Sequence, residues 1–535
     1  MTNSIIKKKV AVIGGGVSGI VAAKVFKSQG HDVIGFERSN SFGGVWDPKR
    51  SYPGVQTQSS KDLYRFTDMP MPESYPEWPE GDQVLKYLNG YARKHDLFGT
   101  FHFNTSVIEM LEKKDNEAGW ILKLKPEDGK EYSQDFDFVV VCSGMFTDPN
   151  KIVHPNQEIF TESGGCVLHS SEYKHIANDM KDRDVVVIGG SKSATDIAVH
   201  AARNGAKSVV LLHRRNVWRI PYFIAGINFK HLLYMRAQEL QFNDWARSGI
   251  WNDPREEMTN VVSQLWYYVK LIATMLCRFF VWANFRALET LLSFQLGLKK
   301  WNMMPSERIE DTVSCELPIA TEGLFECFQN GTIRPIHSTV DKYIESNDGA
   351  NKDETTSLIT GKKIPMSLRL ENGQELTADT VIHATGWKMN HSFLPPALQE
   401  KLVDEKDGQF RLYRWAVNPH LPNIGFVGLN SSFCSVLSSE MIANWLVRYV
   451  DGVLTETPSI ESMDNHIQSM LEWKRKERPA AKVYRGNCIA PFHYLHFDEI
   501  LRDIGAVEKV TGMFTYPDAD KYGRCLESAP QYFVE

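Results

Sequence analysis

An apolar run that ends in a cluster of glycines constrains the fold of this chain more than any other feature. Residues 9–13 read Lys-Val-Ala-Val-Ile, a G-x-G-x-x-G pattern formed by Gly14, Gly16 and Gly19 follows, and residues 17–26 have helical apolar spacing. A short apolar run bounded by glycines is typical of a buried parallel strand. Glycines at these three positions let the backbone turn tightly and approach a pyrophosphate at the helix N-terminus. The sequence therefore predicts a dinucleotide-binding βαβ unit.

An acidic residue stands where such a unit needs one. Glu37 follows the next predicted strand, residues 31–36. A carboxylate at this place accepts hydrogen bonds from ribose hydroxyl groups and repels a 2′-phosphate. The first unit is therefore predicted to bind FAD or NAD rather than NADP.

The same order of elements returns once, much later in the chain. A strand at 184–188 leads into Gly189-Gly190-Ser191-Lys192-Ser193-Ala194, a helix at 193–202 and a strand at 208–212. Ser191 replaces the middle glycine and Ala194 the last one, so this copy is less specific. Gly189, Ser191, Lys192 and Ser193 are its predicted cofactor contacts, and Lys192 is expected to reach the pyrophosphate.

Two arginines follow this second copy where the first has Glu37. Arg214 and Arg215 come directly after the predicted strand. An arginine there binds a 2′-phosphate through paired, charge-assisted hydrogen bonds, which indicates NADPH. The alternative is that both are solvated surface charges.

The length of 535 residues exceeds what one hydrophobic core usually organises. Strands predicted at 136–143 and 380–385 end alike, in Cys-Ser-Gly and Ala-Thr-Gly, and are expected to return to one sheet. The predicted fold is α/β, with two Rossmann-like dinucleotide-binding domains and the NADP domain inserted into a discontinuous FAD domain. The expected boundaries are 1–174 (FAD, first part), 175–335 (NADPH, with a helical insertion) and 336–535 (FAD, second part).

Composition excludes several classes of function. A formal net charge of -6 gives no electrostatic reason for a nucleic-acid partner. The eight cysteines are scattered, without a C-x-x-C pair or a zinc-ligand spacing, so we predict neither a metal site nor a disulfide reductase. The N-terminus lacks the pattern of a signal peptide, and the expected location is cytoplasmic.

One apolar region, residues 264–294, needs a separate interpretation. Four charged residues interrupt it: Lys270, Arg278, Arg286 and Glu289. That is too much charge for an ordinary transmembrane span, so helices that face the core or line a substrate site are expected. The alternative is a weak, peripheral association with a membrane surface.

Two dinucleotide units of opposite 2′ preference imply hydride transfer from NADPH to a flavin. At this point the sequence resembles the flavin-containing monooxygenase family over nearly its whole length. Gly43-Gly44-Val45-Trp46 is similar to the family's G-G-x-W segment beside the flavin, and Ala384-Thr385-Gly386-Trp387 to its A-T-G-Y segment between the domains. The resemblance implies that Gly44, Trp46, Thr385 and Gly386 lie at the cofactors.

The family's fingerprint F-x-G-x-x-x-H-x-x-x-[YF]-[KR] is matched by residues 163–174 except at Ser163, where phenylalanine is usual. Tyr173 stands where the related Baeyer–Villiger enzymes usually have tryptophan, which favours oxygenation of a heteroatom. His169 of the same segment is interpreted as a structural histidine.

Gln58 aligns with an asparagine that lies near the flavin in many members of the family. Members of the plant type often carry glutamine there and a residue other than glycine at the position of Ser191, so this chain resembles that branch most. Gln58 is the candidate catalytic residue, as a buried carboxamide that hydrogen-bonds the peroxyflavin. The alternative is a structural glutamine.

The resemblance implies that NADPH reduces FAD, that O₂ adds to the flavin C4a carbon, and that the hydroperoxide oxygenates a soft nitrogen or sulfur centre of a small molecule, as in N,N-dimethylaniline monooxygenase activity. The cofactor then supplies the oxidant and the protein supplies binding, orientation and exclusion of water. Baeyer–Villiger oxygenation, oxidative decarboxylation of a 2-oxo acid, an NADPH oxidase and a non-catalytic NADPH-binding flavoprotein are the alternatives. Substrate and oligomeric state stay open.

Overall fold

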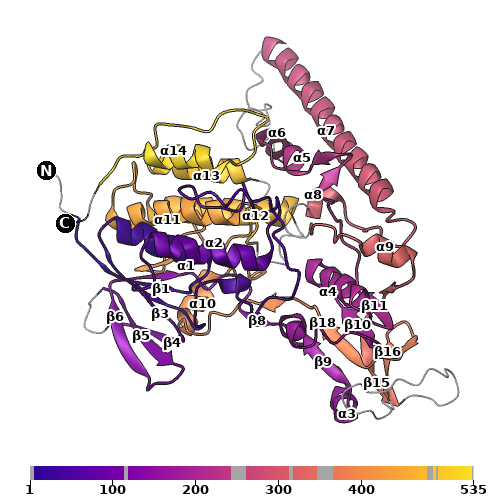
Figure 1. Cartoon of the computed structure of the whole chain (residues 1–535). Coiled ribbons are helices and arrows are strands. Elements are labelled where there is room, and N and C mark those ends of the chain that lie inside the picture. The colour runs from indigo at the N-terminus through magenta and orange to yellow at the C-terminus, as the bar shows by residue number, and fades with distance from the viewer. Residues whose placement is uncertain are drawn as a thin grey trace.

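Two parallel β-sheets, each flanked by helices, organise the chain (Figure 1). The computed structural model describes residues 5–113, 118–242, 261–312, 317–345, 366–478, 486–489, 492–532 and 534. Each sheet has five strands and starts from one of the two glycine turns found in the sequence. The predicted α/β class with two Rossmann-like units is confirmed.

The first sheet has the order β20-β7-β1-β2-β3, with all neighbours parallel. Its strands are β1 (Lys9–Ile13), β2 (Asp32–Phe36), β3 (Phe101–His102), β7 (Phe138–Val141) and β20 (Ile424–Phe426). An antiparallel sheet of β4 (Thr105–Glu112), β5 (Trp120–Pro126) and β6 (Tyr132–Phe136) shares a hydrophobic core with it. The chain leaves this sheet after β7 and returns only at β20, so the unit is discontinuous.

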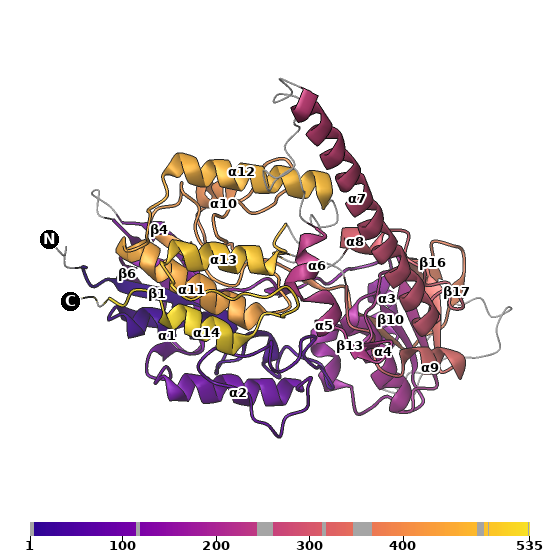
Figure 2. The same cartoon turned by 90° about the horizontal axis from the view of Figure 1, so that it is seen from above.

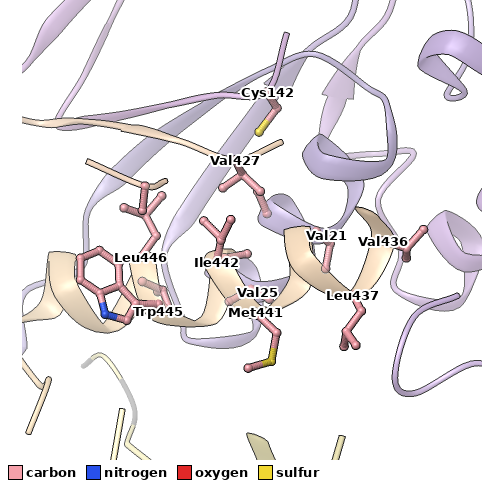
Figure 3. Close-up of a cluster of buried hydrophobic side chains, with 14 of the residues drawn as sticks. Val21, Val25, Cys142, Val427, Val436, Leu437, Met441, Ile442, Trp445 and Leu446 are labelled. Atoms are coloured by element: carbon pink, nitrogen blue, oxygen red, sulfur yellow. The ribbon is translucent and has the colours of Figure 1, made fainter. Parts of the chain in front are cut away.

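Two helices from opposite ends of the sequence cover the first sheet. They are α1 (Val17–Ser28) and α11 (Ser435–Asp451). Val21 and Val25 of α1 belong to one buried cluster with Leu437 and Ile442 of α11 (Figure 3). Because full burial of such a side chain stabilises by about 1.5–3 kcal/mol, this contact ties the C-terminal third of the chain to the N-terminal turn.

Further helices continue this layer. They are α2 (Gly81–Lys94), α12 (Ile460–Glu477), α13 (His493–Asp503) and α14 (Ala519–Glu527). Helix α10 (Pro396–Leu402) packs instead, through Leu398 and Leu402, in the cluster that the first sheet shares with β4, β5 and β6.

The second sheet has the order β14-β11-β10-β18-β9, again all parallel. Its strands are β9 (Cys166–His169), β10 (Asp184–Ile188), β11 (Ser208–His213), β14 (Ile333–His337) and β18 (Thr380–His383). Helix α4 (Lys192–Arg203) follows β10, and the antiparallel strands β15 (Val340–Glu345), β16 (Met366–Leu370) and β17 (Glu375–Leu376) pack against the sheet through one apolar cluster.

The expectation that strands 136–143 and 380–385 return to one sheet is wrong. β7 pairs with β1 and β20, whereas β18 pairs with β10 and β9. The two strands end alike because each borders the glycine turn of its own sheet: a Cβ at Gly14 would lie 2.6 Å from the Cys142 carbonyl oxygen, and one at Gly189 2.4 Å from that of Ala384.

Sheet membership also favours other domain boundaries than those at 174 and 335. β9 lies before the first of these positions and β18 after the second, yet both pair within the second sheet. We therefore propose that the inserted unit extends from β9 to β18.

The remaining described elements are short: η1 (Gly44–Trp46), β8 (Asp148–Pro149), α3 (Gln157–Glu162), η2 (Ser170–His175), β12 (Phe223–Ile224), β13 (Ile227–Asn228), α5 (Lys230–Leu233), α6 (Arg236–Leu240), α8 (Ile309–Thr312), α9 (Leu324–Gln329) and β19 (Trp387–Lys388).

Helix α7 (Val261–Leu296) projects beyond the rest of the molecule at its N-terminal end (Figures 1 and 2). The expectation of helices that face the core or line a substrate site is wrong for this N-terminal half, because Leu265, Ile272 and Phe279 are each more than half exposed. Among the described residues, α7 is the one helix that is long and apolar enough to cross a membrane by those two criteria.

Candidate cofactor and active site

The backbone of the first glycine turn leaves no room for side chains at two positions. Gly14 has a φ of +109°, which L side chains rarely adopt. A Cβ at Gly19 would lie 1.8 Å from the Gly14 carbonyl oxygen. Both glycines are therefore required by the close approach of β1 and α1, whether or not a nucleotide is bound.

Gly16 differs, because the protein itself leaves room for a side chain there. Its φ is −79°, and the nearest atom to an added Cβ is the Gly44 Cα at 3.5 Å. Gly16 is also the N-cap of α1 and offers no side-chain cap, so backbone N–H groups at the helix start remain available to an anion. The missing side chain at Gly16 is thus explained by a ligand, and the cradle between Gly16 and Gly44 fits a pyrophosphate.

Glu37 is held rigidly at the end of β2. Its Oε2 accepts a hydrogen bond from the Gly15 backbone N–H (2.5 Å) and its Oε1 one from that of Ser39 (2.8 Å). Each carboxylate oxygen can accept a further bond, so the side chain is placed to bind ribose hydroxyl groups. Trp46 in η1 is buried nearby, and its indole Nε1 donates to the Tyr64 hydroxyl (2.8 Å).

The second turn accommodates its departure from the glycine pattern. Ser191 is exposed and serves as the N-cap of α4 with a φ of −100°, an ordinary value for a residue with a side chain, and its own side chain makes no cap. Ser193 lies in the first turn of the helix. Gly189, by contrast, has a φ of +148°. The turn therefore keeps the geometry of a dinucleotide site although its middle glycine is replaced.

The predicted 2′-phosphate residue lies at the expected end of the sheet. Arg214 follows β11 directly and is exposed, and Arg215 beside it is half-buried. The Arg215 carbonyl oxygen lies 3.4 Å from where a Cβ of Gly190 would be, so this loop borders the turn.

Lys192 does not extend freely toward the turn. Its Nζ lies 2.6 Å from Oδ1 of Asp196 on the same helix. The Tyr52 hydroxyl, from the first unit, donates to Oδ2 of the same carboxylate (2.9 Å). Lys192 therefore belongs to a polar bridge between the two units. No sequence motif identifies Asp196 and Tyr52 as its partners.

A second cation behind the turn was also missed by sequence reasoning. Arg219 is 1% exposed, and its Nη2 donates to the Gly190 carbonyl oxygen (2.6 Å). Burial lowers the pKa of Arg219 to about 10, so the guanidinium stays positively charged at neutral pH. It holds the Gly190 peptide and adds positive potential behind the turn; no motif distinguishes it from the other arginines.

Gln58 lies where the first unit meets the second. Its Oε1 accepts a hydrogen bond from the Ile319 backbone N–H (3.2 Å). Gln58 is exposed, so the expectation of a buried carboxamide is wrong. With Oε1 engaged, the Nε2 amide group is left as the donor.

Orphaned polar atoms surround this junction. The Thr57 hydroxyl and Oδ1 of Asn430 are buried and have no hydrogen-bond partner among the described residues. The Tyr234 hydroxyl shares this property, and its ring lies 4.6 Å from that of Phe433. Because buried polar atoms are normally paired, these positions fit a bound polar cofactor or substrate.

The two chain crossings between the units run side by side. β8 and β19 pair as antiparallel strands, and the Thr385 hydroxyl donates to the Asn150 carbonyl oxygen (2.6 Å). Gly386 has a φ of +82°, and its carbonyl oxygen lies 3.0 Å from Nε2 of His169. His169 thus contributes to the junction structurally.

Comparison with known proteins agrees with this geometry. The family model for flavin-binding monooxygenase-like proteins matches residues 7–256 and 366–520. The chain is 28% identical to the probable flavin-containing monooxygenase 1 of Arabidopsis thaliana, covering 93% of this chain and 92% of that protein. It is 29% identical to flavin-containing monooxygenase 1 of Oryctolagus cuniculus, covering 93% of this chain and 83% of that protein.

Solved structures show the same fold. S-allyl-L-cysteine S-oxygenase from Allium sativum superposes with a TM-score of 0.58 at 19% identity, over 98% of this chain and 92% of that one. A cyclohexanone monooxygenase bound to ε-caprolactone gives 0.62 at 16% identity, over 92% and 97%. The chain belongs to the flavin-binding monooxygenase-like family. It is a flavin-dependent monooxygenase, and FAD and NADPH are the cofactors that its two turns fit.

Proposed function

We propose that this chain uses NADPH and FAD to insert one atom of O₂ into a soft nitrogen or sulfur centre of a small molecule. One observation carries the proposal. The chain has two dinucleotide turns, and the units that contain them meet at Gln58. The fixed carboxylate of Glu37 follows the first turn, and the exposed Arg214 follows the second. When bound, the nicotinamide supplies a hydride and the flavin supplies the oxygen chemistry.

The residues of this chain bind, orient and shield. The Gly16–Gly44 cradle and the α1 N-terminus hold one pyrophosphate, and Glu37 fixes the adjacent ribose. Arg214 selects a 2′-phosphate in the second site. The hydrogen bond from Tyr52 to Asp196 ties the two units together, and it would help to keep the two cofactor sites in a fixed relative position.

Gln58 is the proposed catalytic donor. Its Oε1 accepts a hydrogen bond from the Ile319 N–H, which leaves the Nε2 amide group as the donor to a bound group. A preorganised donor of this kind typically contributes on the order of 3 kcal/mol where it meets developing charge. The rival role, a purely structural one, would rest on the bond to Ile319 alone.

Two substitutions separate these roles. Gln58→Glu keeps an oxygen that accepts from Ile319 but loses the amide donor, whereas Gln58→Ala loses both. If Gln58 donates to the reacting oxygen, both variants release more hydrogen peroxide per NADPH consumed while flavin reduction stays nearly unchanged. If Gln58→Glu couples NADPH to product as the parent does, Gln58 is structural.

The substrate class is tested by a panel of amines, thioethers, ketones and 2-oxo acids with product identification. Tyr173 stands where the Baeyer–Villiger enzymes usually have tryptophan, which favours the heteroatom substrates. It is buried, and its hydroxyl lies 2.8 Å from Nδ1 of His200. Lactones or esters from ketones would support Baeyer–Villiger chemistry instead. Peroxide alone with every substrate would support an NADPH oxidase.

For location, we propose a cytoplasmic enzyme with peripheral attachment to a membrane through residues 264–294. The exposure of the apolar side chains in this segment supports the attachment.

A further inference from the structure

The N-terminal half of α7 carries a large exposed apolar surface. Twelve large apolar side chains between Val261 and Trp282 are 41–79% exposed, among them Trp266, Met275 and Phe280. At ~150–250 Å² for each aromatic side chain, their exposed area is on the order of 1,000 Å². A typical soluble monomer exposes a largest apolar patch of about 300–600 Å², so this surface marks a contact with something apolar.

The exposed residues cover most of the circumference of the helix. Consecutive helical residues are about 100° apart, which places the twelve side chains on an arc of about 220°. The remaining sector contains Arg278, Phe285 and Leu292, spaced seven residues apart and therefore on one face. Phe285 and Leu292 are buried against the second unit.

This pattern is the reverse of that in a soluble surface helix. In such a helix the apolar stripe faces the core and the charged residues face water. In α7 the outward arc is apolar, whereas Arg278 stands on the sector that continues into the buried face. An apolar surrounding on the outer side accounts for this inversion.

The C-terminal half of α7 fixes the helix to the protein. Arg286 forms ion pairs with Glu289 (2.9 Å) and with Glu310, and the Ile309 N–H donates to Oε1 of Glu289 (2.9 Å). Gln295 Nε2 donates to the Phe223 carbonyl oxygen (2.7 Å). The projecting half is therefore held at a defined angle to the body (Figure 2).

Two observations distinguish a bilayer from a second copy of the chain. A helix from a second copy would cover only a narrow stripe along α7 and leave most of the arc of about 220° exposed. Lipid tails can contact the whole arc. The stretch 261–285 contains Lys270 and Arg278 and no acidic residue, which suits the anionic surface of a membrane.

The flanks of α7 decide how it can lie in the bilayer. The ring of Phe242, before the helix, contacts that of Phe285 in a tilted arrangement with 5.3 Å between centroids, and Leu298 after the helix is fully buried, so both flanks are held by the same body. A segment that enters the bilayer must then leave by the side on which it entered. Residues 261–282 extend over ~33 Å, more than the ~15 Å of one leaflet, so the helix must lie obliquely.

We propose that the N-terminal half of α7 inserts into one leaflet of an anionic bilayer and anchors the enzyme without crossing the membrane. This goes beyond the weak peripheral attachment proposed above and does not depend on the substrate class. Trp282, at the end of the exposed stretch nearer the body, then lies near the polar–apolar boundary, where tryptophan is enriched, and Trp266 lies deeper in the leaflet.

Flotation of the full FAD-loaded chain with phosphatidylcholine vesicles, with and without phosphatidylserine, tests the anchor. We expect the parent to float with the vesicles, more so with phosphatidylserine, and Leu276→Asp combined with Phe280→Asp to lower the binding constant by roughly a hundredfold or more. The matched control is Val507→Asp combined with Phe514→Asp, which places two carboxylates at apolar positions outside α7 that are more exposed still; this variant should float as the parent does.

Lipids brominated on their tails provide the second measurement. They should quench part of the parent's tryptophan fluorescence, and less of it when Trp266 and Trp282 are both changed to phenylalanine. Flavin content and NADPH oxidation of each variant show that it has folded, separately from membrane binding. The proposal is overturned if the parent does not float, if the control pair loses binding equally, or if the α7 pair instead converts a dimer into a monomer.

Discussion

Changing Gly16 to alanine should separate the binding of FAD from the stability of the fold. The φ of −79° suits alanine, and the added Cβ meets only the Gly44 Cα at 3.5 Å. Replacing glycine by alanine at a compatible φ stabilises by about 0.4–1 kcal/mol through the unfolded chain. Alanine is a poorer N-cap than glycine by an amount of the same order, about 0.5–1 kcal/mol, so the two effects nearly cancel.

The same Cβ fills the space through which a pyrophosphate reaches the turn. Overpacking of this kind typically costs about 1–3 kcal/mol, which is roughly a 5- to 150-fold rise in the Kd for FAD. Chemical unfolding of the FAD-free protein and titration with FAD, followed by quenching of flavin fluorescence, measure the two quantities. Gly19→Ala is the control, because its Cβ would lie 1.8 Å from the Gly14 carbonyl oxygen and should destabilise even the FAD-free protein. Unchanged FAD affinity in Gly16→Ala would refute the cradle.

Two further substitutions test the second site and the buried charges. Arg214→Ala should weaken the binding of NADP⁺ by roughly tenfold or more and leave the binding of NAD⁺ nearly unchanged, because a charge-assisted bond to the 2′-phosphate is worth about 1.5–3 kcal/mol. Equilibrium titration measures both affinities, and equal losses for the two nucleotides would disprove the assignment. His383 is 3% exposed, and burial lowers its pKa to about 4 from 6.5. As the pH drops from 6.5 toward 4, the unfolded chain therefore binds a proton that the folded protein does not, and the free energy of unfolding should fall by at most about 3 kcal/mol. His383→Gln should flatten that slope in unfolding curves recorded across this range, and an unaltered slope would assign it to other groups.

The local part of the fold could be predicted from the sequence. β1 with α1 and β10 with α4 lie where the apolar runs and glycines placed them, because each is built from residues close together in the chain. Glu37 and Arg214 follow at strand ends for the same reason. The sheet that each later strand joins could not be predicted in this way. β7 and β18 end in similar residues, and they differ in the strands that they pair with, which lie far away in the sequence.

The environment of side chains was the other part that the sequence left open. An apolar helix has the same pattern whether protein or lipid surrounds it, so α7 was assigned to the interior although Phe280 is 67% exposed. Arg219 and Asp196 could not be recognised, because their roles come from Gly190 and Tyr52, which the fold brings to them. Gln58 was placed by resemblance, and its bond to Ile319 became visible only in three dimensions.

The nested topology has a consequence for the order in which the protein is completed on the ribosome. All five strands of the second sheet lie between Cys166 and His383, so that unit can fold before translation ends. The first sheet lacks β20, and Val21 and Val25 lack their cover from α11, until residues 424–451 have been synthesised. The unit encoded first is therefore finished last, and FAD can be captured stably only by a nearly full-length chain, whereas the NADPH site can form while the ribosome is still at work.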